Sequence, residues 1–270
     1  MYKNLIMKSI KDIFDNYECI GKSLLIPTIL LLVLNFASTS FTSPDQRFSM
    51  GSIFFIFLTI LVDIIILITV HRILILGKDS VPMWGIQKFS KREFNFFLKY
   101  LTVAVVFILI VALTTSLLHF LGISIVAAMF LTMTLGAVLI SRISLVFPAI
   151  AVDTIMSFKD SFEFTKDFKL LIFVTVIIFP ILFSVVVGGI YTLIISMLAA
   201  SISPHINLLL VLLNVAISVF LVSALSNTYI YISETLSSQH NNSQESYQED
   251  REIEENNEDE HKDNDSLSDK

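Results

Sequence analysis

Six stretches of this sequence are each long and apolar enough to cross a lipid bilayer, and this feature limits the fold more than any other. A hydrocarbon core about 30 Å thick is crossed by roughly 20 residues of helix. Only 16% of the 270 residues are charged and the mean hydropathy is +0.77, whereas soluble domains are about 25% charged. The composition excludes a soluble enzyme, a coiled coil and a disordered protein. We expect spans at residues 24–41, 51–76, two within 98–147, 170–200 and about 206–232.

Local breaks divide these stretches. The first span ends in a polar turn at residues 42–45, and residues 98–147 are too long for one helix, so we place a tight hairpin turn at residues 119–122. The fifth span is long enough to tilt or kink, with Pro180 and the pair Gly188-Gly189 as bend sites. Strands of alternating polarity are absent, which excludes an outer-membrane barrel. The prediction is an all-α, polytopic membrane bundle of six transmembrane helices.

The positions of the basic residues predict the orientation. Six spans put both termini on one side of the membrane, and 17 of the 18 Lys and Arg residues then fall on that side, leaving Arg47 on the other. Since basic loops stay inside, we expect both termini to be cytoplasmic and the protein to lie in the inner cell membrane. Residues 24–39 resemble a signal peptide, but the long helical pattern before them argues against cleavage.

The segments outside the spans also have distinct patterns. Residues 1–22 have apolar side chains at helical spacing with lysines between them, which predicts an interfacial amphipathic helix before the membrane domain at 23–232. Its lysines would meet the anionic headgroups of the bilayer. We expect a second interfacial helix within residues 148–169. The basic, aromatic loop at 77–99 is typical of interfacial anchoring, and we expect no nucleic-acid partner.

Residues 233–270 form an acidic tail. They hold 13 acidic and 3 basic residues and almost no apolar ones, whereas the preceding 232 residues hold 15 basic and 11 acidic. Such a segment cannot bury enough surface to offset its ordering entropy, so we predict that the tail is disordered. On the cytoplasmic side it offers a contact for a protein partner.

Asp63 is the one acidic residue well inside a span. An ionised carboxylate at the bilayer centre costs roughly 2.5–3.5 kcal/mol on insertion scales, so its presence needs an explanation. It could be a proton or cation site. It could equally be a structural group that is neutral or paired, facing Asn35, Asn214 or Arg142. A misplaced span boundary is the remaining alternative.

The other candidate residues lie at the cytoplasmic ends of spans. We expect Arg72 to reach the interface and His71 to be structural rather than a ligand, with a chemical role as the alternative. Arg142 and Asp153 flank the exit of the fourth span, and we expect them to pair as a clamp. Cys19 is alone, so no intrachain disulfide forms. We find no motif for a catalytic site, metal or cofactor, and expect the protein not to be an enzyme.

Two motifs suggest a family. Residues 141–153 read Ser-Arg-Ile-Ser-Leu-Val-Phe-Pro-Ala-Ile-Ala-Val-Asp, and residues 158–166 read Phe-Lys-Asp-Ser-Phe-Glu-Phe-Thr-Lys. This resembles the pattern of a bacterial six-span family, the glycerophosphodiester-phosphodiesterase membrane domain and its YciC-like inner-membrane relatives. Residues 71–78 also resemble a His-Arg-x-x-Leu-Leu-Gly-Glu run in such proteins, with Lys78 in place of the acid.

The resemblance covers roughly residues 1–235 and implies a bacterial inner-membrane protein of unsettled function. The phosphodiesterase of the family name belongs to a separate soluble domain, so we transfer no esterase activity. The leading hypothesis is a non-enzymatic membrane protein, acting in envelope maintenance or as a membrane scaffold. The alternative is a small transporter or channel that uses Asp63 near the bilayer midplane.

Overall fold

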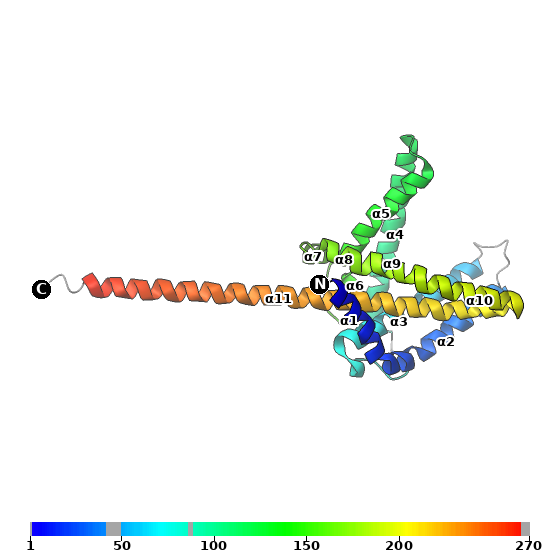
Figure 1. Cartoon of the computed structure of the whole chain (residues 1–270), viewed down its shortest axis with the longest axis horizontal. Coiled ribbons are helices and arrows are strands. Elements are labelled where there is room, and N and C mark those ends of the chain that lie inside the picture. The colour runs from blue at the N-terminus through cyan, green and yellow to red at the C-terminus, as the bar shows by residue number, and fades with distance from the viewer. Residues whose placement is uncertain (1, 42–49, 86–88, 266–270) are drawn as a thin grey trace. The chain divides into compact units, whose positions relative to one another are not determined.

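The computed structural model describes residues 2–41, 50–85 and 89–265, with side chains described as far as residue 239. Within these ranges the chain forms helices and no strand (Figure 1). Six helices are long and apolar enough to span a membrane, which confirms the all-α, six-span prediction. They are Tyr17–Phe41, Met50–Leu76, Lys91–Phe120, Ile125–Ala151, Lys169–Ser201 and Pro204–Gln239.

The chain divides into two compact units, Met1–Tyr229 and Ile230–Lys270. We call the first of these the membrane unit. The expected turn at 42–45 and Arg47 lie outside the described residues. The first half of the chain contains α1 (Tyr2–Asp15), α2 (Tyr17–Phe41), α3 (Met50–Leu76), η1 (Lys78–Ser80), α4 (Lys91–Phe120) and α5 (Ile125–Ile143). The second half contains α6 (Val146–Ala151), α7 (Phe158–Phe164), α8 (Lys169–Ile172), η2 (Phe173–Ile178), α9 (Phe179–Phe183), η3 (Ser184–Gly188), α10 (Gly189–Ser201), η4 (Pro204–Leu209) and α11 (Leu210–Asp265).

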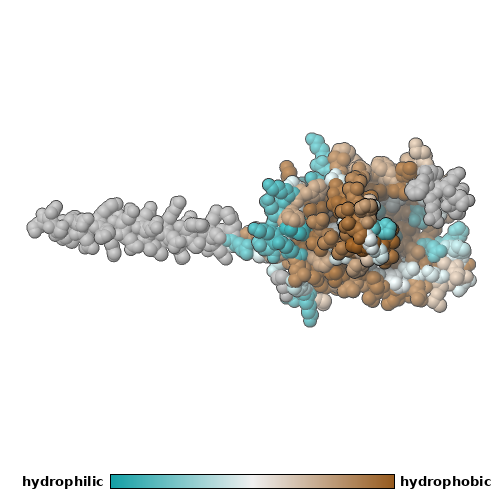
Figure 2. All heavy atoms as spheres, turned by 90° about the horizontal axis from the view of Figure 1, so that it is seen from above, coloured by the Kyte–Doolittle hydropathy of each residue, from teal (hydrophilic) through white to brown (hydrophobic). Residues whose placement is uncertain are grey.

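Helix α3 is the centre of the membrane unit because it contributes to two hydrophobic clusters. Val62, Ile66 and Val70 recur at helical spacing and pack with buried residues of α2 and α11. On another side, Ile64 and Ile68 pack with buried residues of α4 and α6. The outer surface of the unit is also apolar, and Figure 2 shows hydrophobic residues over most of the visible face. Such a surface suits a lipid environment.

The α4–α5 hairpin, which we call the arm, turns where the sequence predicts. Helix α4 ends at Phe120, and Gly122 adopts a φ of 87°, which glycine reaches without the steric cost of a side chain. The two helices pack against each other. In α4 only Glu93 and Phe96 are buried, and both lie in its first two turns. The arm therefore contacts the other helices near one end and stands apart from them beyond it (Figure 1).

The fifth span departs from α-helical geometry near its expected bend sites. Two π-helical segments interrupt it, η2 at Phe173–Ile178 and η3 at Ser184–Gly188. They flank the turn that contains Pro180, and the second ends at Gly188. Proline lacks an N–H and its ring crowds the carbonyl of the preceding turn, so regular α-helical bonding cannot continue through it.

Helix α1 is amphipathic as predicted, but one of its faces is buried in protein. Leu5 and Ser9 are buried, and the Ser223 hydroxyl of α11 donates a hydrogen bond of 2.8 Å to the carbonyl oxygen of Ser9. The short helix expected within 148–169 is present as α7. Helix α4 begins seven residues before the span expected from residue 98. The reason is a capping box, in which Ser90 and Glu93 satisfy each other's backbone N–H groups.

Helix α11 begins at Leu210, within the sixth span, and continues to Asp265. The prediction that the acidic tail at residues 233–270 is disordered stays a prediction.

Candidate functional site

Four charged side chains meet at the end of the membrane unit where α3 finishes and α4 begins, which we call the base: Arg72, Arg92, Asp153 and Glu93, whose Oε1 lies 2.8 Å from Arg92 Nη2. Arg72 Nη1 lies 2.8 Å from Asp153 Oδ2 and also donates to the carbonyl oxygen of Ala151 at 3.0 Å. Arg92 Nη1 approaches the same carboxylate oxygen at 3.3 Å. Arg72 Nε donates to the carbonyl oxygen of Ser80. One carboxylate therefore joins the end of α3, the start of α4 and the loop after α6.

The backbone explains how Asp153 reaches this position. Helix α6 ends in a Schellman motif, in which the N–H of Asp153 donates to the carbonyl of Ile150 and that of Thr154 donates to Ala149. Such a motif needs a left-handed residue, and Asp153 has a φ of 62°. Aspartate is among the few non-glycine residues that adopt this conformation readily.

Arg142 does not pair with Asp153, which corrects the sequence prediction. Its Nη2 donates to the carbonyl oxygen of Phe162 at 2.6 Å, and its Nε donates to Thr165 Oγ1 at 3.3 Å. The guanidinium carbon lies 3.3 Å from the centroid of the Phe162 ring. In return, the Ser161 hydroxyl donates to the carbonyl oxygen of Arg142. Arg142 therefore binds the end of α5 to the carboxyl end of α7, where a cation is favourable.

His71 is buried, as a structural role requires. Its Nδ1 lies 2.7 Å from Ser226 Oγ on α11, so the pair joins α3 to α11. Residues 223–228 of α11 form a buried polar run that the sequence analysis missed, with Thr228 Oγ1 lying 3.1 Å from Thr175 Oγ1 of η2. The sequence Ser-Ala-Leu-Ser-Asn-Thr at these positions indicates such a run, because four polar residues stand together in an otherwise apolar span.

Asp63 lies at the middle of α3, with thirteen residues between it and each end of the helix, or about 20 Å at the helical rise. Its neighbours Val62 and Ile64 are buried in the two different clusters, while the side chain of Asp63 itself is exposed. Within the described residues it forms no hydrogen bond or ion pair. In particular, it is not paired with Asn35, Asn214 or Arg142, which removes the partners expected for a structural role.

The five candidate residues thus separate into different environments. Arg72 and Asp153 share the ion-pair cluster at the base, Arg142 and His71 each join two helices, and Asp63 stands alone on α3. No three His, Cys, Asp or Glu side chains gather into a metal site in the part of the chain that the structure describes. No known protein family, curated protein or solved structure matches the chain. The family resemblance of residues 141–153 stays a prediction.

Proposed function

We propose that this multi-pass membrane protein is a non-enzymatic scaffold of the inner cell membrane, and that the arm is the surface through which it associates with other membrane proteins. The observation that carries the proposal is the exposure of the arm. Of the 30 residues of α4, only Glu93 and Phe96 are buried, so nearly its whole apolar length is open to lateral contact.

The physical chemistry of membranes favours this use of the arm. Lipid tails are as apolar as leucine, so helices associate through close packing rather than through the hydrophobic effect. An exposed two-helix arm offers packing surfaces that the other spans do not fill. The ion pairs of Asp153 and the bonds of Arg142 hold the base of the arm in one orientation. On the cytoplasmic side, the acidic tail offers a second contact for a protein partner.

Photo-crosslinking in living cells tests this proposal. A photoreactive amino acid replaces Leu113 of α4, which is 71% exposed, and the matched control replaces Leu193 of α10, which is 60% exposed. We expect discrete protein adducts from position 113 and lipid adducts alone from position 193. If both positions, and others along α4 and α5, yield only lipid adducts in native membranes, the scaffold role of the arm is refuted.

A specific observation supports a second candidate function, transport or conduction of a proton or cation. Asp63 is exposed at mid-span and has no partner within the described residues. An unpaired carboxylate at this depth is costly, and such residues commonly mark ion pathways. The carboxylate, which is exposed on α3 between the two hydrophobic clusters, would bind the ion.

Flux measurements with the full chain in liposomes test the second candidate. We expect saturable movement of protons, sodium or potassium that Asp63→Asn abolishes and that Asp79→Asn in η1 leaves unchanged. The absence of flux for all three ions, or flux that Asp63→Asn leaves intact, would exclude an ion pathway through Asp63.

A further inference from the structure

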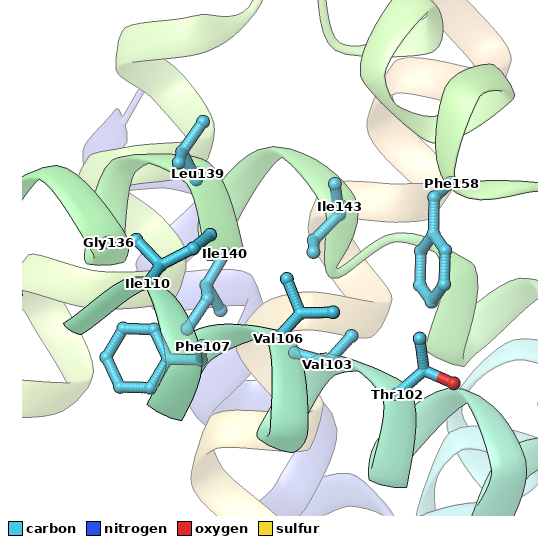
Figure 3. Close-up of a pocket in the computed structure, with 10 residues that line it drawn as sticks. All are labelled: Thr102, Val103, Val106, Phe107, Ile110, Gly136, Leu139, Ile140, Ile143 and Phe158. Atoms are coloured by element: carbon cyan, nitrogen blue, oxygen red, sulfur yellow. The ribbon is translucent and has the colours of Figure 1, made fainter. Parts of the chain in front are cut away.

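An apolar groove of about 230 Å³ runs between the two helices of the arm near its base. Figure 3 shows ten lining residues from α4, α5 and the start of α7. On α4 the lining extends from Thr102 to Ile110, about 12 Å along the helix axis. Gly136 of α5 leaves room for the Phe107 ring, which a Cβ at that position would strike. The groove is therefore narrow, elongated and almost wholly apolar.

A second pocket of about 460 Å³ lies one helical turn nearer the base, and we call it the polar pocket because five charged side chains line it beside apolar ones. Its basic side chains are Lys91, Arg92 and Lys99, and its acidic side chains are Asp153 and Asp160. Lys99 is three residues before Thr102, and its ammonium group lies 4.3 Å from the centroid of the Phe158 ring, which lines the groove. Lys99 therefore stands where the polar pocket and the apolar groove meet.

The charges of this pocket favour an anion. The carboxylates of Asp153 and the neighbouring Glu93 are balanced by Arg72 and Arg92, and the Asp160 carboxylate accepts a hydrogen bond of 2.8 Å from the backbone N–H of Ser157. Neither Lys91 nor Lys99 forms an ion pair within the described part of the chain. Besides the Ser157 N–H, the Lys99 ammonium, which lies over the Phe158 ring, helps lower the pKa of the Asp160 carboxyl, so Lys99 and Lys91 carry the positive charge that remains in the pocket.

We infer that the arm binds one anionic phospholipid, with its phosphate between Lys91 and Lys99 and part of one acyl chain in the groove. The chemistry of the two adjoining pockets matches the two ends of such a molecule. An acyl chain gains little by leaving the bilayer for another apolar site, so the groove positions the chain by shape. The lysines supply the preference for an anionic headgroup. This site does not depend on association of the arm with another protein.

Native mass spectrometry of the delipidated full chain tests the inference. The protein is titrated with phosphatidylglycerol or with phosphatidylcholine of the same acyl chains. We expect one tightly bound phosphatidylglycerol, with an affinity at least about tenfold above that for phosphatidylcholine. Inorganic phosphate should not displace it, because it cannot use the groove.

Paired variants separate the two halves of the site. Lys91→Gln with Lys99→Gln should reduce phosphatidylglycerol binding to the phosphatidylcholine level, whereas Lys159→Gln, outside both pockets, should not. Val106→Trp fills the groove and should remove the tight site, whereas Ile108→Trp on the opposite face of α4 should retain it. Thermal unfolding of each variant controls for folding.

Three results would overturn the inference. The first is equal binding of the two lipids by the wild-type protein. The second is unchanged selectivity in the double lysine variant. The third is a protein dimer whose abundance falls with Val106→Trp while lipid binding persists, because the occupant of the groove would then be a second copy of this chain.

Discussion

Asp153 combines a left-handed backbone with two ion pairs, and three substitutions separate these contributions. Asparagine tolerates the left-handed conformation but has no charge. Glycine adopts it freely and lacks the side chain altogether. Alanine loses the charge and also resists the conformation, at roughly 1–2 kcal/mol.

The exposure of the paired side chains determines how much free energy of unfolding the two ion pairs contribute. The Asp153 side chain is 58% exposed, while those of Arg72 and Arg92 are 14% and 16% exposed. Exposed pairs typically contribute about 0.2–1 kcal/mol each, so loss of both should cost about 0.4–2 kcal/mol. We therefore expect Asp153→Asn and Asp153→Gly to be destabilised by about 0.4–2 kcal/mol. Asp153→Ala should be destabilised by about 1.4–4 kcal/mol when the conformational cost of about 1–2 kcal/mol is added.

The stabilities of the three variants can be ranked by heating the detergent-solubilised protein and measuring by size-exclusion chromatography how much stays folded. One kcal/mol corresponds to about 2–4 °C in a chain of this size, so the alanine variant should unfold several degrees below the glycine variant. Raising the salt concentration from about 0.05 M to 0.5 M should reduce the difference in unfolding temperature between wild type and Asp153→Asn, because salt screens partly exposed ion pairs. An alanine variant as stable as glycine would refute the backbone argument, and a salt-independent gap would refute the electrostatic one.

Three further outcomes follow from contacts elsewhere in the membrane unit. Arg142→Met should destabilise the protein by about 2–4 kcal/mol in the same unfolding assay, because it removes charge-assisted bonds that end α7; an unchanged midpoint would contradict this. Gly136→Val should lower the midpoint because its side chain strikes the Phe107 ring, and Phe107→Ala should restore part of the loss; no rescue would place the defect elsewhere. The backbone N–H of Ser157 and then its hydroxyl lower the pKa of Asp160, so this cap should stabilise α7 at neutral pH and be lost as the pH falls through the lowered pKa. As the pH falls through the lowered pKa, the protection of the α7 amides, corrected for the intrinsic slowing of exchange in acid, should decrease for wild type and much less for Asp160→Asn; an equal decrease would contradict the assignment.

The sequence by itself determined the six spans, the turn of the arm and the short helix α7. These features depend on local properties: the hydropathy of about 20 consecutive residues, a glycine that permits a left-handed turn, and apolar residues at helical spacing. The capping box of Ser90 and Glu93 is also a local signal, because a Ser followed three residues later by a Glu marks a helix that starts at Lys91.

The tertiary structure decided which charged residues meet. Asp153 and Arg142 are eleven residues apart and suggest a pair, yet Asp153 binds arginines 81 and 61 residues away. Only the packing of α3, α4 and α6 brings Arg72 and Arg92 to that carboxylate. Likewise, the sequence places Asp63 at mid-span, but the positions of the two hydrophobic clusters decide that it is exposed and unpaired. Hydropathy fixes how deep a residue lies along its own helix, whereas its partners depend on which faces of different helices come together.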